Sequence, residues 1–153
     1  MNFRIDYKKA MLEALEVAES ATASGDVPVG AVIFNSEDQL VGVGHNLRER
    51  DCDPTAHAEV IAIREAALKA GTWRLDNHTL VVTLEPCAMC AGAIAQSRIK
   101  TLVFGAWDEK AGAVGSVWDI LRDPRAIHQV EVISGIMEAE CADLLTTFFK
   151  QQR

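Results

Sequence analysis

The sequence predicts an α/β fold in which a mixed β-sheet is covered by helices on both faces. Residues 29–34 and 40–44 are short apolar, β-rich runs separated by a polar turn at 35–38, which is the pattern of a β-hairpin. Residues 79–84 are a nearly continuous apolar run, as a buried central strand should be. A helix-like segment and a further strand at 101–105 follow, so the order predicts βαβ crossovers beside the hairpin.

The other elements of the first half can be taken in order. Apolar side chains at helical spacing predict a first helix within residues 4–24, ended at 24–26 by Ser-Gly-Asp. After a polar, loop-like stretch at 45–53, Pro54 and its neighbour Thr introduce a helix at 56–70. The glycine that follows stops this helix.

The second half continues the same alternation. We predict a helix of small residues at 88–97, a short helix at 118–121 and a last strand at 130–133. The apolar face of the final helix carries Met137, Cys141, Leu144, Leu145 and Phe148. The expected order is therefore α-β-β-α-β-α-β-(α)-β-α, a three-layer α/β/α sandwich with a mixed five-stranded sheet.

Length and composition narrow the class of protein. The 153 residues are expected to form a single domain, 1–153. No apolar run reaches the ~18 residues that span a bilayer, and the first residues lack the apolar core of a signal peptide. With four cysteines in a chain of this size, reduced thiols in a cytoplasmic protein are expected. The net charge of −7 argues against a general nucleic-acid binder, although one basic face is compatible with it.

Two short motifs could together form a metal site. His57 and Glu59 make an H-x-E triplet, and Cys87 and Cys90 make a C-x-x-C pair directly after Pro86. Each motif precedes a predicted helix, whose N-terminus favours thiolate and carboxylate groups. The imidazole and the two thiols, with no obvious fourth ligand, are typical of a zinc site with one position left open for water. Glu59, which is not needed as a ligand, would then act as a proton shuttle.

Simpler interpretations apply to each motif alone. The C-x-x-C pair could be half of a structural zinc knuckle in an RNA-binding module, or a redox dithiol. A structural zinc needs a fourth ligand, and no spare cysteine or histidine forms a second recognised pair. A redox dithiol leaves His57 and Glu59 without a role. The joint pattern of H-x-E followed by P-C-x-x-C is much more specific than either half.

That joint pattern is the signature of the zinc deaminases of nucleobases. Over nearly its whole length the chain resembles the bacterial tRNA-specific adenosine deaminases, within the cytidine/deoxycytidylate deaminase superfamily. At Trp107 it departs from these relatives, which often carry a different, sometimes basic, residue there. The residues that carry the resemblance are 27–32, Asn46, 53–59, 73–75, 83–93, 97–99, 103–106, Asp108, Lys110, 112–113, 115–116 and 148–149.

The resemblance implies a cytidine-deaminase-like fold, a homodimer and a function. The expected reaction is zinc-dependent hydrolysis of adenosine to inosine and ammonia at the wobble position of a tRNA anticodon loop. A deaminase of a free base or nucleoside, such as guanine or cytosine, is the alternative, because the same zinc and glutamate would serve it.

The resemblance also assigns roles to individual residues. One Zn²⁺ per chain would be held by His57, Cys87 and Cys90, with Glu59 as the general acid and base. The expected substrate-binding residues divide between the base pocket and the groove for the anticodon loop. They are Val29, Asn46, Ala58 and Pro86 for the base, and Asp108, Lys110 and Phe149 for the loop.

Overall fold

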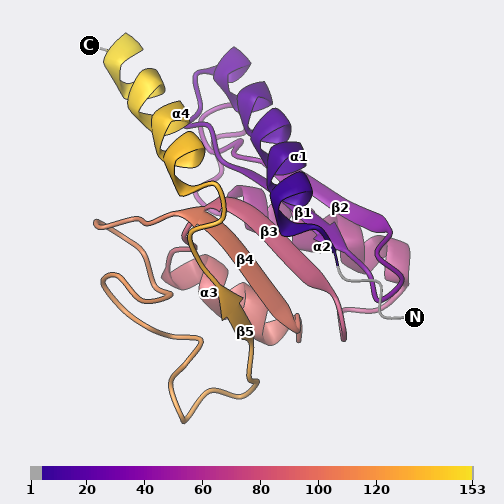
Figure 1. Ribbon diagram of the computed structural model, residues 1–153. Coiled ribbons are helices and arrows are strands. Elements are labelled where there is room, and N and C mark those ends of the chain that lie inside the picture. Colours follow the sequence, from indigo (N-terminus) through magenta and orange to yellow (C-terminus); the bar gives the residue numbers. More distant parts are fainter. Residues whose placement is uncertain (1–4, 153) are drawn as a thin grey trace.

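In the computed structural model, which describes residues 5–152, five strands form one mixed sheet in the order β2-β1-β3-β4-β5 (Figure 1). Strand β1 pairs antiparallel with both β2 and β3, whereas β3, β4 and β5 run parallel. The predicted mixed five-stranded α/β sheet is therefore confirmed. The strands are β1 (Gly30–Phe34), β2 (Leu40–His45), β3 (Thr79–Leu84), β4 (Thr101–Ala106) and β5 (Glu131–Ile133).

Helices cover both faces of this sheet. Helices α1 and α4 lie on one face and α2 and α3 on the other, which gives the three predicted layers (Figure 1). None of the helices within residues 5–152 is long and apolar enough to cross a membrane. The helices are α1 (Tyr7–Glu19), the 3-10 helix η1 (Ser20–Ser24), α2 (Ala58–Ala70), α3 (Ala88–Gln96) and α4 (Glu138–Gln151).

The central strands are apolar on both faces because each face packs on its own helix pair. In β1, Ala31 and Ile33 pack toward α2 and α3, while Val32 packs toward α1 and α4. Strand β4 divides in the same way, with Phe104 on the first side and Val103 on the second. Successive side chains of a strand point to opposite faces, so a continuous apolar run is what a strand buried on both sides requires.

One edge of the sheet gathers the segments that carry the motifs. Strands β2, β3 and β4 end at this edge, and β1, which runs the other way, begins there. Helix α2 follows β2 and helix α3 follows β3, so the N-termini of both helices lie at the same edge. Gly42 and Gly44 let α2 approach closely, because a Cβ at either position would collide with backbone of that helix.

The structure corrects one predicted element and moves several boundaries. No helix forms at 118–121; instead Gly115 N–H donates to the Trp118 carbonyl and Ile120 N–H to the Ala113 carbonyl, so the backbone bonds of this segment close a turn. The first helix ends at Glu19 and continues as η1, and its predicted start at Arg4 lies outside the described residues. The second helix begins at Ala58 rather than at 56.

Candidate functional site

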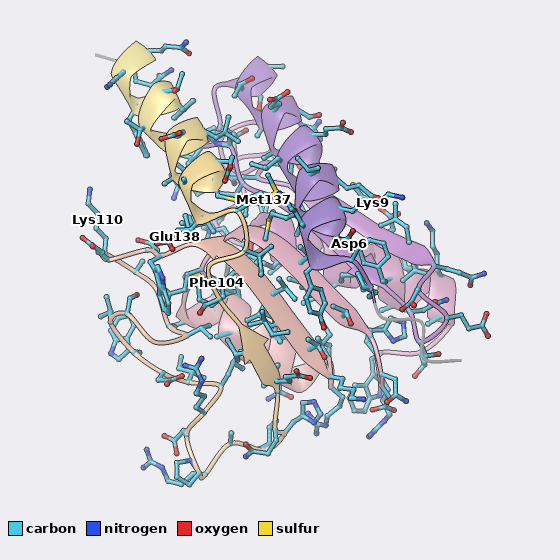
Figure 2. All side chains as sticks on the ribbon, viewed as in Figure 1. Asp6, Lys9, Phe104, Lys110, Met137 and Glu138 are labelled. Carbon is cyan, nitrogen blue, oxygen red and sulfur yellow. The ribbon has the colours of Figure 1, made fainter. Side chains whose placement is uncertain are left out.

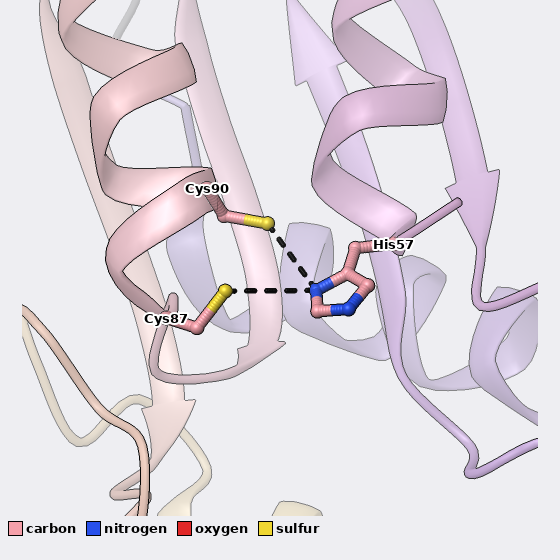
Figure 3. Close-up of side chains that lie close together, drawn as sticks. All are labelled: His57, Cys87 and Cys90. Carbon is pink, nitrogen blue, oxygen red and sulfur yellow. Dashed lines mark hydrogen bonds between the residues drawn. The ribbon is translucent and has the colours of Figure 1, made fainter. Parts of the chain in front are cut away.

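The three predicted metal ligands converge between the starts of α2 and α3 (Figure 3). The Nδ1 atom of His57 lies 3.6 Å from Cys87 Sγ and 3.5 Å from Cys90 Sγ. His57 is the N-cap of α2 and Cys87 the N-cap of α3, both with extended backbone, and Cys90 lies in the first turn of α3. The cluster therefore sits where two helix N-termini favour anionic groups.

The spacing of these three atoms fits a zinc ion. A tetrahedral zinc with sulfur at about 2.3 Å and nitrogen at about 2.1 Å holds the two atoms about 3.6 Å apart. The observed Sγ–Nδ1 separations match this value, and all three ligand atoms lie within 4.8 Å of one another. Among residues 5–152 this is the one group of His, Cys, Asp and Glu side chains gathered in this way.

The thiols are placed to supply the thiolate that a metal requires. A hydrogen bond from Cys90 and the neighbouring His57 lower the pKa of the Cys87 thiol to about 4, against the opposing effect of burial. The pKa of Cys90 is raised because its proton bonds to Cys87 and because the thiol is buried beside Glu59. Cys87 is therefore ionised at neutral pH, in the form that binds metal.

Glu59 lies two residues beyond His57 in the first turn of α2 and lines the same pocket. The residue is 4% exposed. Burial raises the pKa of its carboxyl, and the nearby His57 and Cys90 only partly offset this effect. A carboxyl whose pKa is shifted toward neutrality is suited to taking up and releasing protons.

A pocket of about 210 Å³ opens above these groups. It is smaller than the ~300–1,000 Å³ sites of drug-sized ligands, so it suits one small planar group. Four of the predicted substrate-binding residues line it, namely Val29, Asn46, Ala58 and Asp108. The remaining lining residues are Val27, Arg48, His57, Glu59, Leu84, Glu85, Cys87 and Ala111.

The Asn46 amide is held in one orientation. Its Nδ2 donates to the Val27 carbonyl at 3.2 Å, and its Oδ1 accepts from the Arg48 backbone N–H at 3.1 Å. If the amide were turned over, its oxygen would face the Val27 carbonyl and its NH2 group would face the Arg48 N–H, so both hydrogen bonds would be lost. Because an amide has two N–H groups and two lone pairs, each end keeps one further position with which it can bind a ligand in the pocket.

The other predicted substrate residues lie outside this pocket. Lys110 and Phe149 line an adjoining groove of about 670 Å³, which shares Asp108 with the pocket. Lys110 extends from the loop that follows β4 (Figure 2). Phe149 lies on α4 and is 50% exposed. Pro86 does not line the pocket; its carbonyl accepts a hydrogen bond from Ala113 N–H at 2.8 Å.

The sequence also matches a known family over this site. Residues 4–106 match the cytidine and deoxycytidylate deaminase zinc-binding region. The matched range contains His57, Glu59, Cys87 and Cys90. The chain belongs to the cytidine and deoxycytidylate deaminase family.

Individual members of this deaminase family align with most of the chain. It is 51% identical over 146 residues to the tRNA-specific adenosine deaminase of Haemophilus influenzae, covering 95% of this chain and 84% of that protein. A solved structure from studies of A-to-I editing by tRNA:A34 deaminases superposes with a TM-score of 0.86 and 41% identity, covering 90% and 99% of the two chains. The guanine deaminase of Nitrosomonas europaea superposes with a TM-score of 0.77 and 25% identity, covering 92% and 83%.

The sequence interpretation missed one organising residue of this deaminase site, Glu85. Its carboxylate is 2% exposed. It accepts hydrogen bonds from the backbone N–H groups of Asp108, Val114 and Ser116 at 3.0, 2.9 and 3.2 Å, and from the Ser116 hydroxyl at 2.6 Å. Glu85 thus ties the loop that carries Asp108 to the segment that carries Cys87. An acidic residue at the end of a buried strand was the available signal, because buried carboxylates need such partners.

Proposed function

We propose that this deaminase hydrolyses adenosine to inosine, with release of ammonia, at the wobble position of a tRNA anticodon loop. The observation that carries the proposal is one small pocket that contains His57, Cys87 and Glu59, in a chain half of whose residues are identical to those of a tRNA-specific adenosine deaminase. We assign the activity to one zinc-dependent deaminase domain, residues 1–153, working in the cytoplasm.

His57 Nδ1 and the sulfurs of Cys87 and Cys90 would hold one zinc ion. Zinc, when bound there, supplies a Lewis acid that makes a water nucleophilic near neutral pH. Three protein ligands are the number found in catalytic zinc sites, which keep a fourth position open, whereas structural sites use four. This ligand count favours a catalytic centre over a structural one.

Glu59 would move the protons of the reaction. As water adds to C6 of adenine, the Glu59 carboxylate takes a proton from the water and delivers it to the ring nitrogen N1. Glu59 then takes the proton of the new C6 hydroxyl and gives it to the amine, so that the C6–N bond breaks, ammonia departs and the carbonyl of inosine forms. A single carboxyl can perform each transfer in turn because the pocket keeps it beside the reacting carbon.

The pocket walls would orient the base. Val29 offers an apolar surface to one side of the ring, and the fixed Asn46 amide can donate to and accept from a purine edge. Ala58 is the first residue of α2, and the N–H groups of a first helical turn have no partner within the helix. Together, Val29, the Asn46 amide and the backbone N–H groups at the start of α2 would hold the base with C6 toward His57 and Glu59.

A deaminase of a free base is the second candidate, favoured by the similarity to a guanine deaminase. Zinc and Glu59 would serve either substrate, so residues beyond the pocket must discriminate. A free base would need only the pocket of about 210 Å³. The adjoining groove, lined by Lys110 and Phe149, adds a further space of about 670 Å³. The groove favours a macromolecular substrate.

The decisive experiment compares substrates under one set of conditions. Purified protein is incubated with an anticodon stem-loop that carries adenosine at the wobble position, and separately with free adenosine, cytidine, cytosine and guanine. We expect inosine in the stem-loop and little turnover of the free compounds. Comparable or faster turnover of any free compound would overturn the tRNA assignment and leave the zinc-deaminase chemistry standing.

Lys110→Ala and Phe149→Ala should each weaken binding of the stem-loop with little effect on zinc content. Lys110 would contact phosphate, and Phe149 would pack against the loop. Binding should also fall steeply with salt, because phosphate contacts release counterions. Fluorescence anisotropy over a salt series measures the stem-loop affinity and its salt dependence, and metal analysis measures the zinc content. Lys69→Ala is the control, because Lys69 pairs with Glu65 at the end of α2 away from the pocket. Unchanged affinity in both variants would contradict this use of the groove.

We also propose that the chain forms a homodimer through an apolar surface on α3 and the loop after β4. Met89, Val117 and Trp118 are 38, 44 and 56% exposed, and the space beside Gly92 is open. Such exposed apolar groups are typical of interaction sites. Sedimentation at micromolar concentration should give a mass twice the 16.7 kDa of one chain; a species of 16.7 kDa alone would exclude the dimer.

A further inference from the structure

Arg48 is the one arginine or lysine among the described residues that line the pocket. The other ionisable lining groups besides the metal ligands are acidic: Glu59, Glu85 and Asp108. The Arg48 side chain is 50% exposed, so the guanidinium lies where the pocket opens to solvent. Its ion pair with the exposed Glu49 is 3.8 Å long, and pairs of this kind contribute little. The guanidinium is therefore free to bind an anionic ligand.

The turn that carries Arg48 is held in place by a buried carboxylate. Asp26 is fully buried and accepts the backbone N–H groups of Glu49 and Arg50 at 2.6 and 3.3 Å, together with the Ser24 hydroxyl at 2.6 Å. Burial by itself would raise the pKa of Asp26, but these hydrogen bonds and the charge of Arg48 hold it below its usual value. Arg48 is thus presented from an ordered backbone, which reduces the entropy lost when a ligand binds.

Arg48 lines the pocket and Lys110 the adjoining groove, and the two residues follow different strands of the sheet. Arg48 follows the end of β2 and Lys110 the end of β4, and strands β1 and β3 lie between them at the same edge of the sheet. A nucleotide whose base enters the pocket leaves its sugar-phosphate backbone at the mouth, running away on both sides. Lys110 lines the groove and does not line the pocket, so it would meet that backbone on the groove side.

We propose that Arg48 binds a phosphate of the RNA backbone on the side of the target nucleotide opposite the groove, an inference that rests on the proposed function. The planar guanidinium can donate two parallel hydrogen bonds to phosphate oxygens. Arg48 would thereby fix the path of the RNA strand as it enters the site. It binds substrate and takes no part in moving protons.

The test uses full-length zinc-loaded protein and a stem-loop that already carries inosine at the wobble position, so that binding is measured without turnover. Arg48→Ala should weaken binding about tenfold, as expected for a lost charged hydrogen bond. It should also reduce the slope of log affinity against log salt by about 0.7, the value for one phosphate contact in a single strand. Arg48→Lys should retain most of the salt slope.

Arg50→Ala is the matched control. Arg50 is two residues away on the same turn, but its guanidinium pairs with Asp51 at 2.8 Å and does not line the pocket. It should bind the stem-loop as the wild type does. If the Arg48 and Arg50 variants change affinity and salt slope equally, or neither changes them, the assignment to Arg48 is overturned.

A second arm identifies the contacted group. Single phosphates flanking the wobble nucleotide are replaced in turn by uncharged methylphosphonates. At one position the replacement should weaken binding to the wild type and have no further effect on the Arg48→Ala protein. Additive losses at every position would overturn the phosphate contact. A wild-type protein that forms no inosine from the adenosine stem-loop refutes the proposed function instead, so the two failures are distinguishable.

Discussion

Replacing Glu59 with glutamine should remove most of the deaminase activity and leave the zinc bound. The amide has nearly the shape of the carboxyl but cannot accept and release the protons that the reaction moves. General acid–base groups typically contribute ~10²–10⁴-fold, and we expect a loss at the upper end because Glu59 would serve several transfers. Single-turnover formation of inosine in the wobble stem-loop, together with metal analysis of the same sample, measures both outcomes.

Glu65→Gln provides the control for this substitution. Glu65 lies on the same helix, is partly exposed and pairs with Lys69 at 3.1 Å, and it does not line the pocket. The control should keep wild-type turnover, zinc and thermal stability. Turnover near the wild-type value in Glu59→Gln would make the proton-shuttle role untenable, whereas loss of zinc in that variant would show that Glu59 also supports the metal.

Removing any one of His57, Cys87 or Cys90 should abolish both zinc binding and activity. With three protein ligands there is no spare donor to replace one that is lost. Residues that only hydrogen-bond to a metal ligand already contribute about 10–100-fold to metal affinity. We therefore expect loss of a ligand to weaken zinc binding by at least about 100-fold. Metal analysis of His57→Ala, Cys87→Ala and Cys90→Ala checks this. Chelation of the wild type should likewise abolish turnover, and added zinc should restore it.

The two remaining cysteines are controls for these thiols. Cys52 is exposed, and Cys141 is buried on α4 against the opposite face of the sheet. Cys52→Ser and Cys141→Ser should each retain about one zinc per chain, although Cys141→Ser buries a hydroxyl and should lose some stability. Loss of zinc in either control would show that the ligand set is wrong.

Much of the fold and the metal ligands could be read from the sequence because both depend on local patterns. A continuous apolar run such as Thr79–Leu84 has few interpretations other than a strand buried on both faces. The same holds for the ligands, since H-x-E and P-C-x-x-C each place their side chains at a helix start, where local backbone geometry orients them. Each motif alone had other interpretations, and the two motifs taken together predicted the ligand set.

Other features depended on contacts between distant parts of the chain. A short apolar stretch at 118–121 suggested a helix, yet its backbone bonds to Ala113 and Gly115 in a loop that the Glu85 carboxylate organises. Phe149 reaches the groove only because α4 packs on the same face of the sheet as α1, beside the loop after β4. No local periodicity encodes such pairings.

By itself, then, the sequence determined the sheet, the helices other than the one expected at 118–121, the zinc ligands and the glutamate beside them. Only the tertiary structure decided that His57 presents Nδ1 to the thiols and that Val27 and Arg48 hold the Asn46 amide. It also decided that Arg48 lines the pocket while Lys110 lines the adjoining groove. The physical reason is the order of the strands. Strand β1 lies between β2 and β3 and is antiparallel to both, so β2, β3 and β4 run in the same direction and the residues that follow them meet at one edge.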